Sequence, residues 1–130
     1  MSSRRYLGGT PFHGEFTSAD ASALNEANSR FSLYGMGSTS SITLASTDQV
    51  VITDLKLICG TTALTVTVYD GANNTVAAGE RITMGTYPAN GGEAQNFTTG
   101  HYCQTGTYPK VITSAAGQID VQIRGYIYRV

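Results

Sequence analysis

At 130 residues the chain has the size of one domain, long enough to form a hydrophobic core without metals or many disulfides. Its net charge is -1 and only 13% of its residues are charged, so it lacks the basic field expected of a nucleic-acid-binding protein. Thr, Ser, Gly and Tyr are plentiful. This composition indicates an all-β domain whose outer faces carry uncharged polar side chains.

Residues 1–16 are rich in glycine and aromatic side chains but show no regular hydrophobic pattern. The arginines near the start are not followed by an apolar run, and no stretch approaches the roughly 20 apolar residues that span a bilayer, so we expect neither a signal peptide nor a membrane partner. The segment is either a mobile tail or, as we favour, an extended arm that docks on another surface. The docking candidates are Arg4, Arg5, Tyr6, Phe12 and Phe16.

Residues 17–40 connect this arm to the rest of the chain. A helix over 18–27 is one interpretation, with Thr17 or Ser18 as its N-cap, and irregular coil is the other because asparagine disfavours a helix interior. Residues 30–34 can form a short strand, and the glycine- and serine-rich residues after them indicate a mobile connection. We therefore divide the chain into an arm with its connection, residues 1–40, and a β-sandwich domain, residues 41–130.

Short alternating segments, separated by glycine and asparagine, follow from residue 41 to the end. Short strands at such regular spacing are typical of an antiparallel sandwich or barrel. The sequence shows no strand–helix–strand alternation, which would indicate a parallel sheet. About eight strands in this length predict a jelly-roll-like sandwich, with an immunoglobulin-like sandwich as the alternative. The expected strands are 42–46, 50–59, 64–69, 75–78, 80–84, 94–103, 109–114 and 118–129.

The last strand has the clearest alternation. Its isoleucines and valine share one face, whereas Arg124, Tyr126 and Tyr128 share the other. Tyr and Arg are enriched in protein interfaces, so we predict a subunit contact at these three residues. The alternative is ordinary packing on the protein surface. A carbohydrate-binding surface, on which tyrosine rings stack against a sugar, is a further alternative, although Trp is absent. The other tyrosines that lie near turns are Tyr69, Tyr87, Tyr102 and Tyr108.

Residues suited to catalysis or metal binding have no recognisable spacing. Cys59 and Cys103 form no C-x-x-C pair, and His13 and His101 belong to no nucleophile or metal motif. We predict two buried free thiols rather than a disulfide, because free cysteine behaves as a small hydrophobe. The expectation is a protein that is not an enzyme, with no catalytic, metal or cofactor site.

The segments Val76–Gly92 and Ala116–Ile127 resemble, in strand cadence and turn residues, the small jelly-roll decoration (cement) proteins of tailed bacteriophage particles. The resemblance implies a homotrimer that binds the major capsid protein on the outside of an assembled icosahedral shell. It also implies assembly in the host cytoplasm and a final location on the virion, without nucleic acid or membrane as partner. A phage tail-fibre or baseplate component and a carbohydrate-binding module remain alternatives.

Overall fold

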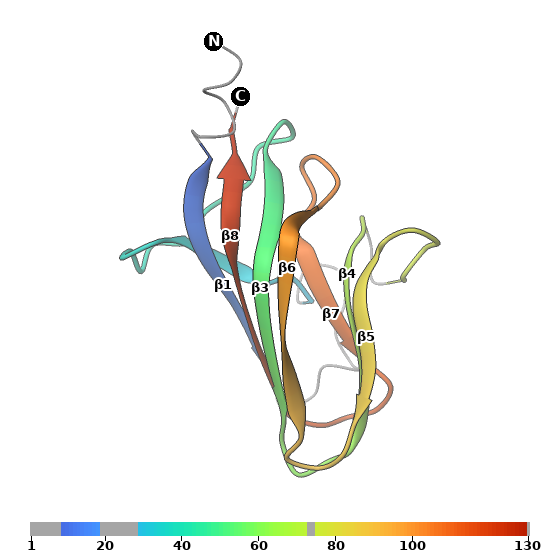
Figure 1. Ribbon diagram of the computed structural model, residues 1–130. Helices are drawn as coiled ribbons and strands as arrows, with labels where there is room; N and C mark the ends of the chain where they lie inside the picture. Colours follow the sequence, from blue (N-terminus) through green and yellow to red (C-terminus); the bar gives the residue numbers. More distant parts are fainter. Residues whose placement is uncertain (1–8, 19–28, 73–74, 130) are drawn as a thin grey trace.

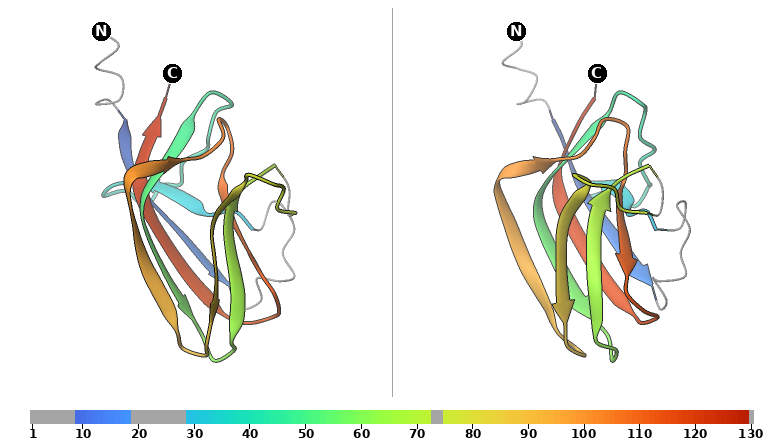
Figure 2. Two further views of the ribbon diagram at one scale, coloured as in Figure 1. Left: turned by 45° about the vertical axis from the view of Figure 1, so that its right-hand side comes forward. Right: turned by 90° about the vertical axis from the view of Figure 1, so that its right-hand side faces the viewer.

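The computed structural model describes residues 9–18, 29–72 and 75–129. Two antiparallel sheets pack face to face (Figures 1 and 2), which confirms the predicted all-β sandwich. No helix in these described ranges is long and apolar enough to cross a membrane. The strands are β1 (Thr10–Ser18), β2 (Ser32–Gly35), β3 (Gln49–Cys59), β4 (Leu64–Asp70), β5 (Arg81–Tyr87), β6 (Gly92–Tyr102), β7 (Pro109–Thr113) and β8 (Ile119–Tyr128).

The strands pair in a nested order. The larger sheet runs β2-β1-β8-β3-β6 and the smaller runs β5-β4-β7, so β1 pairs with β8, β3 with β6, and β4 with β5. A fully nested order also needs the segment after β1 to pair with β7. Residues 29–31 make this pairing, because Phe31 N donates to the Pro109 carbonyl and Val111 N donates to the Ser29 carbonyl, each at 3.0 Å. A long hairpin wound on itself pairs strands in this way.

The structure corrects the predicted arm over residues 10–16. These residues belong to β1, which lies between β2 and β8, so the predicted boundary at residue 41 falls inside the sandwich. Phe12 and Phe16 are 1% and 5% exposed and belong to the core, so they are not free to dock on a capsid. Between them Gly14 also faces inward, where an added Cβ would lie 2.9 Å from Ile123 and Leu33. This glycine hides the alternation in the sequence.

Two of the predicted strands, 75–78 and 42–46, are not strands in the structure. Residues 75–78 lie in a loop that folds back on itself, since Asp70 N donates to the Glu80 carbonyl at 2.9 Å and Ala77 N to the Glu80 carboxylate at 2.8 Å. Residues 42–46 form a connection held by a bond from Ile42 N to the Leu33 carbonyl at 2.7 Å. The proposed helix over 18–27 lies, apart from residue 18 in β1, outside the described residues.

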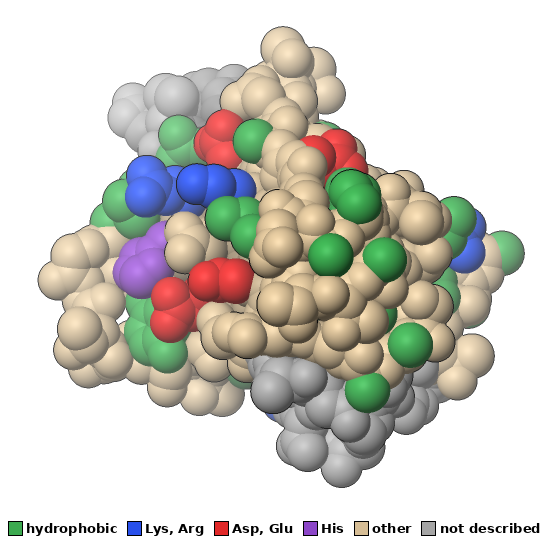
Figure 3. Space-filling model, turned by 90° about the horizontal axis from the view of Figure 1, so that it is seen from below, with side chains coloured by type: hydrophobic (Ala, Val, Ile, Leu, Met, Phe, Trp, Pro, Cys, Tyr) green, Lys and Arg blue, Asp and Glu red, His purple; other side chains and the backbone are tan. Residues whose placement is uncertain are grey.

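The core lies between the sheets and is built mainly from β3, β4 and β8; buried and exposed side chains alternate along β8 and the second half of β3, whereas β4 is buried almost throughout. Each fully buried Leu, Ile or Val side chain contributes roughly 1.5–3 kcal/mol of hydrophobic stabilisation. At one end the turns 60–63, 88–91 and 114–117 contain no charged residue. Seen from this end, uncharged polar and backbone atoms predominate over the middle of the view, where hydrophobic side chains are scattered, and charged side chains gather toward the left (Figure 3).

Candidate functional site

The outer face of the five-stranded sheet carries Arg124, Tyr126 and Tyr128, the three residues of the last strand that the sequence predicts as a subunit contact. In β8, Ile123 and Ile127 are buried whereas Arg124 and Tyr126 are exposed, as the alternation predicted. Arg124 pairs with His13 of β1 on one side and with Asp54 of β3 on the other. The sheet therefore brings side chains from the two halves of the chain onto one face.

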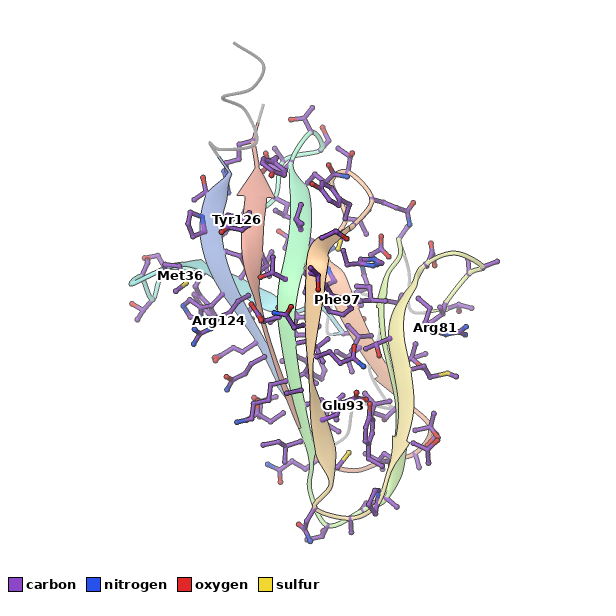
Figure 4. The ribbon with its side chains drawn as sticks, viewed as in Figure 1. Met36, Arg81, Glu93, Phe97, Arg124 and Tyr126 are labelled. Carbon is purple, nitrogen blue, oxygen red and sulfur yellow. The ribbon has the colours of Figure 1, made fainter. Side chains whose placement is uncertain are left out.

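Apolar and aromatic side chains gather near one end of this face. Met36, Tyr102 and Tyr126 are 54%, 53% and 44% exposed, and Tyr102 stacks on Tyr128 with ring centroids 6.4 Å apart. Tyr126 and Tyr102 both lie opposite Val51, on its two sides. We call Met36, Tyr102, Tyr126 and Tyr128 the aromatic patch; Met36 and Tyr126 are labelled beside Arg124 in Figure 4.

A shallow hollow of about 140 Å³ connects Met36 to Tyr126, with Pro11, Thr53 and Arg124 also in its lining. The sequence indicates a mobile connection around Met36 and places Tyr102 only near a turn. The alternation of β6 gives a local signal that Tyr102 is exposed, but its position beside Tyr126 depends on the pairing of β3 with both β6 and β8.

Polar residues occupy the middle of the same face. Asp54 accepts from Asn96 Nδ2 at 2.8 Å and from Thr53 Oγ1 at 2.9 Å, so both of its oxygens are engaged. Arg124 makes no ion pair within the described part of the chain, even though Asp54 is its cross-strand neighbour. The middle of the face thus keeps a cation that is open to a partner.

A buried polar cluster lies away from this face, where β4 and β7 meet the loops beyond them. Gln104 N donates to Asp70 Oδ2 at 2.7 Å, and Lys110 donates to the carbonyls of Gly71 and Tyr108. Burial raises the pKa of Asp70, against the opposing effects of the Gln104 bond and of His101, whose Nε2 lies 4.0 Å from Asp70 Oδ1. These contacts fasten the loop after β4 to the loop between β6 and β7.

A second polar network closes one side of the sandwich between β5 and β6. Tyr87 donates to Glu93, and Gln95 Nε2 donates to Glu93 at 2.7 Å and to Thr83 Oγ1 at 3.0 Å. Burial and the bond to Glu93 raise the pKa of the Tyr87 hydroxyl. Figure 4 shows Glu93 on the side of β6 nearer to β5. The network connects the two sheets where the aliphatic core ends.

Both cysteines are free and buried, which confirms the prediction of two free thiols and excludes the disulfide. Burial raises the pKa of both Cys59 and Cys103, so the reactive thiolate form is disfavoured at each. Within the described ranges, no three His, Cys, Asp or Glu side chains come together in a way that could hold a metal ion.

The structure describes two of the five residues predicted for capsid contact. Arg4, Arg5 and Tyr6 lie outside the described residues, and Phe12 and Phe16 are in the core. The residues predicted for subunit contact share one exposed face. Comparisons of the chain with protein-family models, with curated proteins and with solved structures found no match. The geometry of the outer face is therefore the basis for a functional argument.

Proposed function

We propose that this chain is a structural virion protein, a decoration protein that binds the outside of an assembled icosahedral shell and stabilises it. The observation that carries the proposal is the aromatic patch on a sheet face that no described segment covers, with Arg124 at its border. Tyr, Met and Arg are enriched in the parts of protein surfaces that become buried on association. The nested strand pairing supports the jelly-roll class to which the resemblance points.

In this proposal the chain forms a homotrimer in which Arg124, Tyr126 and Tyr128 contact a neighbouring subunit. The shell contact is assigned to the residues before β1, including Arg4, Arg5 and Tyr6. A ligand that binds the assembled shell better than its free subunits stabilises the shell by mass action. A trimer engages several shell sites at once, which raises the total affinity without any new contact.

Solution mass tests the trimer and the role of the patch. We expect light scattering to report a trimer for the wild-type chain and a monomer for Tyr126→Ala. The matched control is Met84→Ala, because Met84 is 53% exposed on the smaller sheet, and this variant should remain a trimer. A monomeric wild type, or a Tyr126→Ala trimer of unchanged stability, would contradict the assigned subunit contact.

Shell binding tests the function itself. Empty shells are assembled from the major capsid protein of the proposed particle, and their thermal disruption is measured with and without this chain. We expect the wild-type chain to raise the disruption temperature and to co-sediment with shells, and a chain lacking residues 1–8 to do neither. Shells that neither bind the wild-type chain nor gain stability from it would refute the proposal.

A carbohydrate-binding module is the second candidate, favoured by the stacked pair Tyr102 and Tyr128 beside Tyr126. Aromatic faces on a flat sheet can pack against sugar rings. Saturable glycan binding that is lost in Tyr102→Ala, by a wild-type chain that ignores shells, would favour the module. Glycan binding that Tyr102→Ala leaves unchanged would argue against it.

A further inference from the structure

The backbone of β6 is open along one side from Gly92 to Asn96. β6 ends the strand order of the larger sheet, and among the described residues no further strand of that sheet pairs with it; the strands drawn past β6 in Figure 1 belong to the smaller sheet. Cys59 N donates to the Gly91 carbonyl at 2.7 Å, and the same register pairs Leu57 with Glu93. Because bonded and non-bonded pairs alternate in an antiparallel ladder, Gly92, Ala94 and Asn96 direct their N–H and C=O groups away from β3.

This edge lacks two of the usual protections against strand addition and has a third, the inward-pointing charge of Glu93. Natural edge strands carry lysine or proline, or are very short, whereas Gly92–Asn96 has neither residue type. Its one charged residue, Glu93, is held by Tyr87 and Gln95 on the inner side. The opposite edge of the sheet, β2, is only four residues long. The β6 edge is therefore the better template for an added strand.

A hollow beside this edge carries unpaired positive charge. It has a volume of about 480 Å³, and its lining includes Asp54, Lys56, Ala94, Gln122 and Arg124. Ala94 lies opposite Lys56, and its short side chain leaves the ammonium group accessible from the edge. Asp54 is engaged by Asn96 and Thr53, and neither Lys56 nor Arg124 has an ion-pair partner among the residues that the structure describes.

We propose that the β6 edge binds an extended, acidic segment of a partner polypeptide, which adds as a further strand and places a carboxylate over Lys56. Strand addition derives affinity from backbone hydrogen bonds and specificity from alternate side chains. A carboxylate on Lys56 forms a charge-assisted hydrogen bond, which is stronger than a neutral one. This surface adjoins the aromatic patch at Arg124, but the carboxylate is placed over Lys56 and the inference does not depend on the proposed decoration function.

Two labelled peptides test the charge preference with the full chain. The first is acetyl-Thr-Val-Thr-Glu-Thr-Val-Thr-amide, and the second has Lys in place of Glu. By fluorescence anisotropy we expect the Glu peptide to bind about tenfold more tightly than the Lys peptide, with the difference shrinking as salt is added. Equal binding of the two, or no saturable binding of the Glu peptide at millimolar concentration, would overturn the proposal.

Three variants assign the binding to this edge. Ala94→Pro removes an outward N–H without breaking a bond to β3, so binding of both peptides should fall about tenfold or more. Lys56→Gln should abolish the preference for Glu while keeping the binding. Tyr126→Ala should change neither, which separates this surface from the aromatic patch. Wild-type binding by Ala94→Pro, or a retained preference in Lys56→Gln, would overturn the proposal.

Hydrogen exchange on the wild-type chain provides a measurement that does not require Ala94→Pro to fold. At saturating Glu peptide, the amides of Ala94 and Asn96 should exchange about tenfold or more slowly, because they gain partners. The amide of Gln95 already bonds to β3 and is the internal control. Unchanged exchange at Ala94 and Asn96 would overturn strand addition.

Discussion

Gly125 of β8 lies so close to Val51 of β3 that an added Cβ would overlap the Val51 carbonyl oxygen. The two strands pair along their whole length, with an irregularity between Ile52 and Asp54 at this level of the sheet. At this level of the β3–β8 pair only glycine fits, which helps to fix the register on which the outer face depends.

Gly125→Ala should destabilise the protein by at least about 3 kcal/mol, because a backbone carbonyl cannot move aside as a flexible side chain can. Urea unfolding followed by circular dichroism measures the change. Gly35→Ala is the control: its Cβ would be 3.9 Å from Ser38, an ordinary contact, so its free energy of unfolding should change by less than about 0.5 kcal/mol. Similar stability of the two variants would refute the close approach.

Phe12→Ala should lower the free energy of unfolding by about 3–5 kcal/mol, because the ring is fully buried between the sheets. Removing residues 1–16 should prevent folding, since it deletes most of a strand that pairs with both β2 and β8. Thermal unfolding compares both with a truncation of residues 1–8, which ends before β1. A chain that stays folded and stable after removal of residues 1–16 would contradict this role of β1 and favour the interpretation of these residues as an arm.

The two thiols should be unreactive in the folded protein. Cys59 and Cys103 are buried, and burial raises the pKa of each, so little thiolate is available to a thiol reagent. Ellman's reagent should label neither cysteine in buffer and both after unfolding in urea. Rapid labelling of Cys103 in the native protein would contradict its buried position.

Asp70 should make the stability depend on pH. Burial raises the pKa of its carboxyl group above the ordinary value of 3.8, so the folded state holds this proton to a higher pH than the unfolded state. The contribution of this group to stability therefore falls as the pH rises from the ordinary pKa through the raised one. In Asp70→Asn, which keeps an acceptor for Gln104 N, this fall should disappear from urea unfolding measured across the window. An unchanged pH profile would contradict the raised pKa.

Local alternation predicted the faces of β8 correctly, because the two-residue period of a strand is set within the strand itself. The same rule was available for β1, where Phe12 and Phe16 both point inward. Gly14, Gly8 and Gly9 obscured it, and space for Ile123 and Leu33 is the reason that position 14 is glycine. A glycine that faces the core adds no hydrophobic side chain to the pattern, so the sequence of β1 indicates an extended arm rather than a strand.

By itself the sequence determined the all-β class, the two free thiols and the exposure of Arg124 and Tyr126, because each follows from composition or from neighbours along one strand. Only the tertiary structure decided that β1 lies inside the larger sheet, that Tyr102 joins Tyr126, and that β6 is an open edge. These features depend on which distant strands pair and in which register. Backbone hydrogen bonds supply that pairing and are much the same for every residue type, so local patterns cannot specify it.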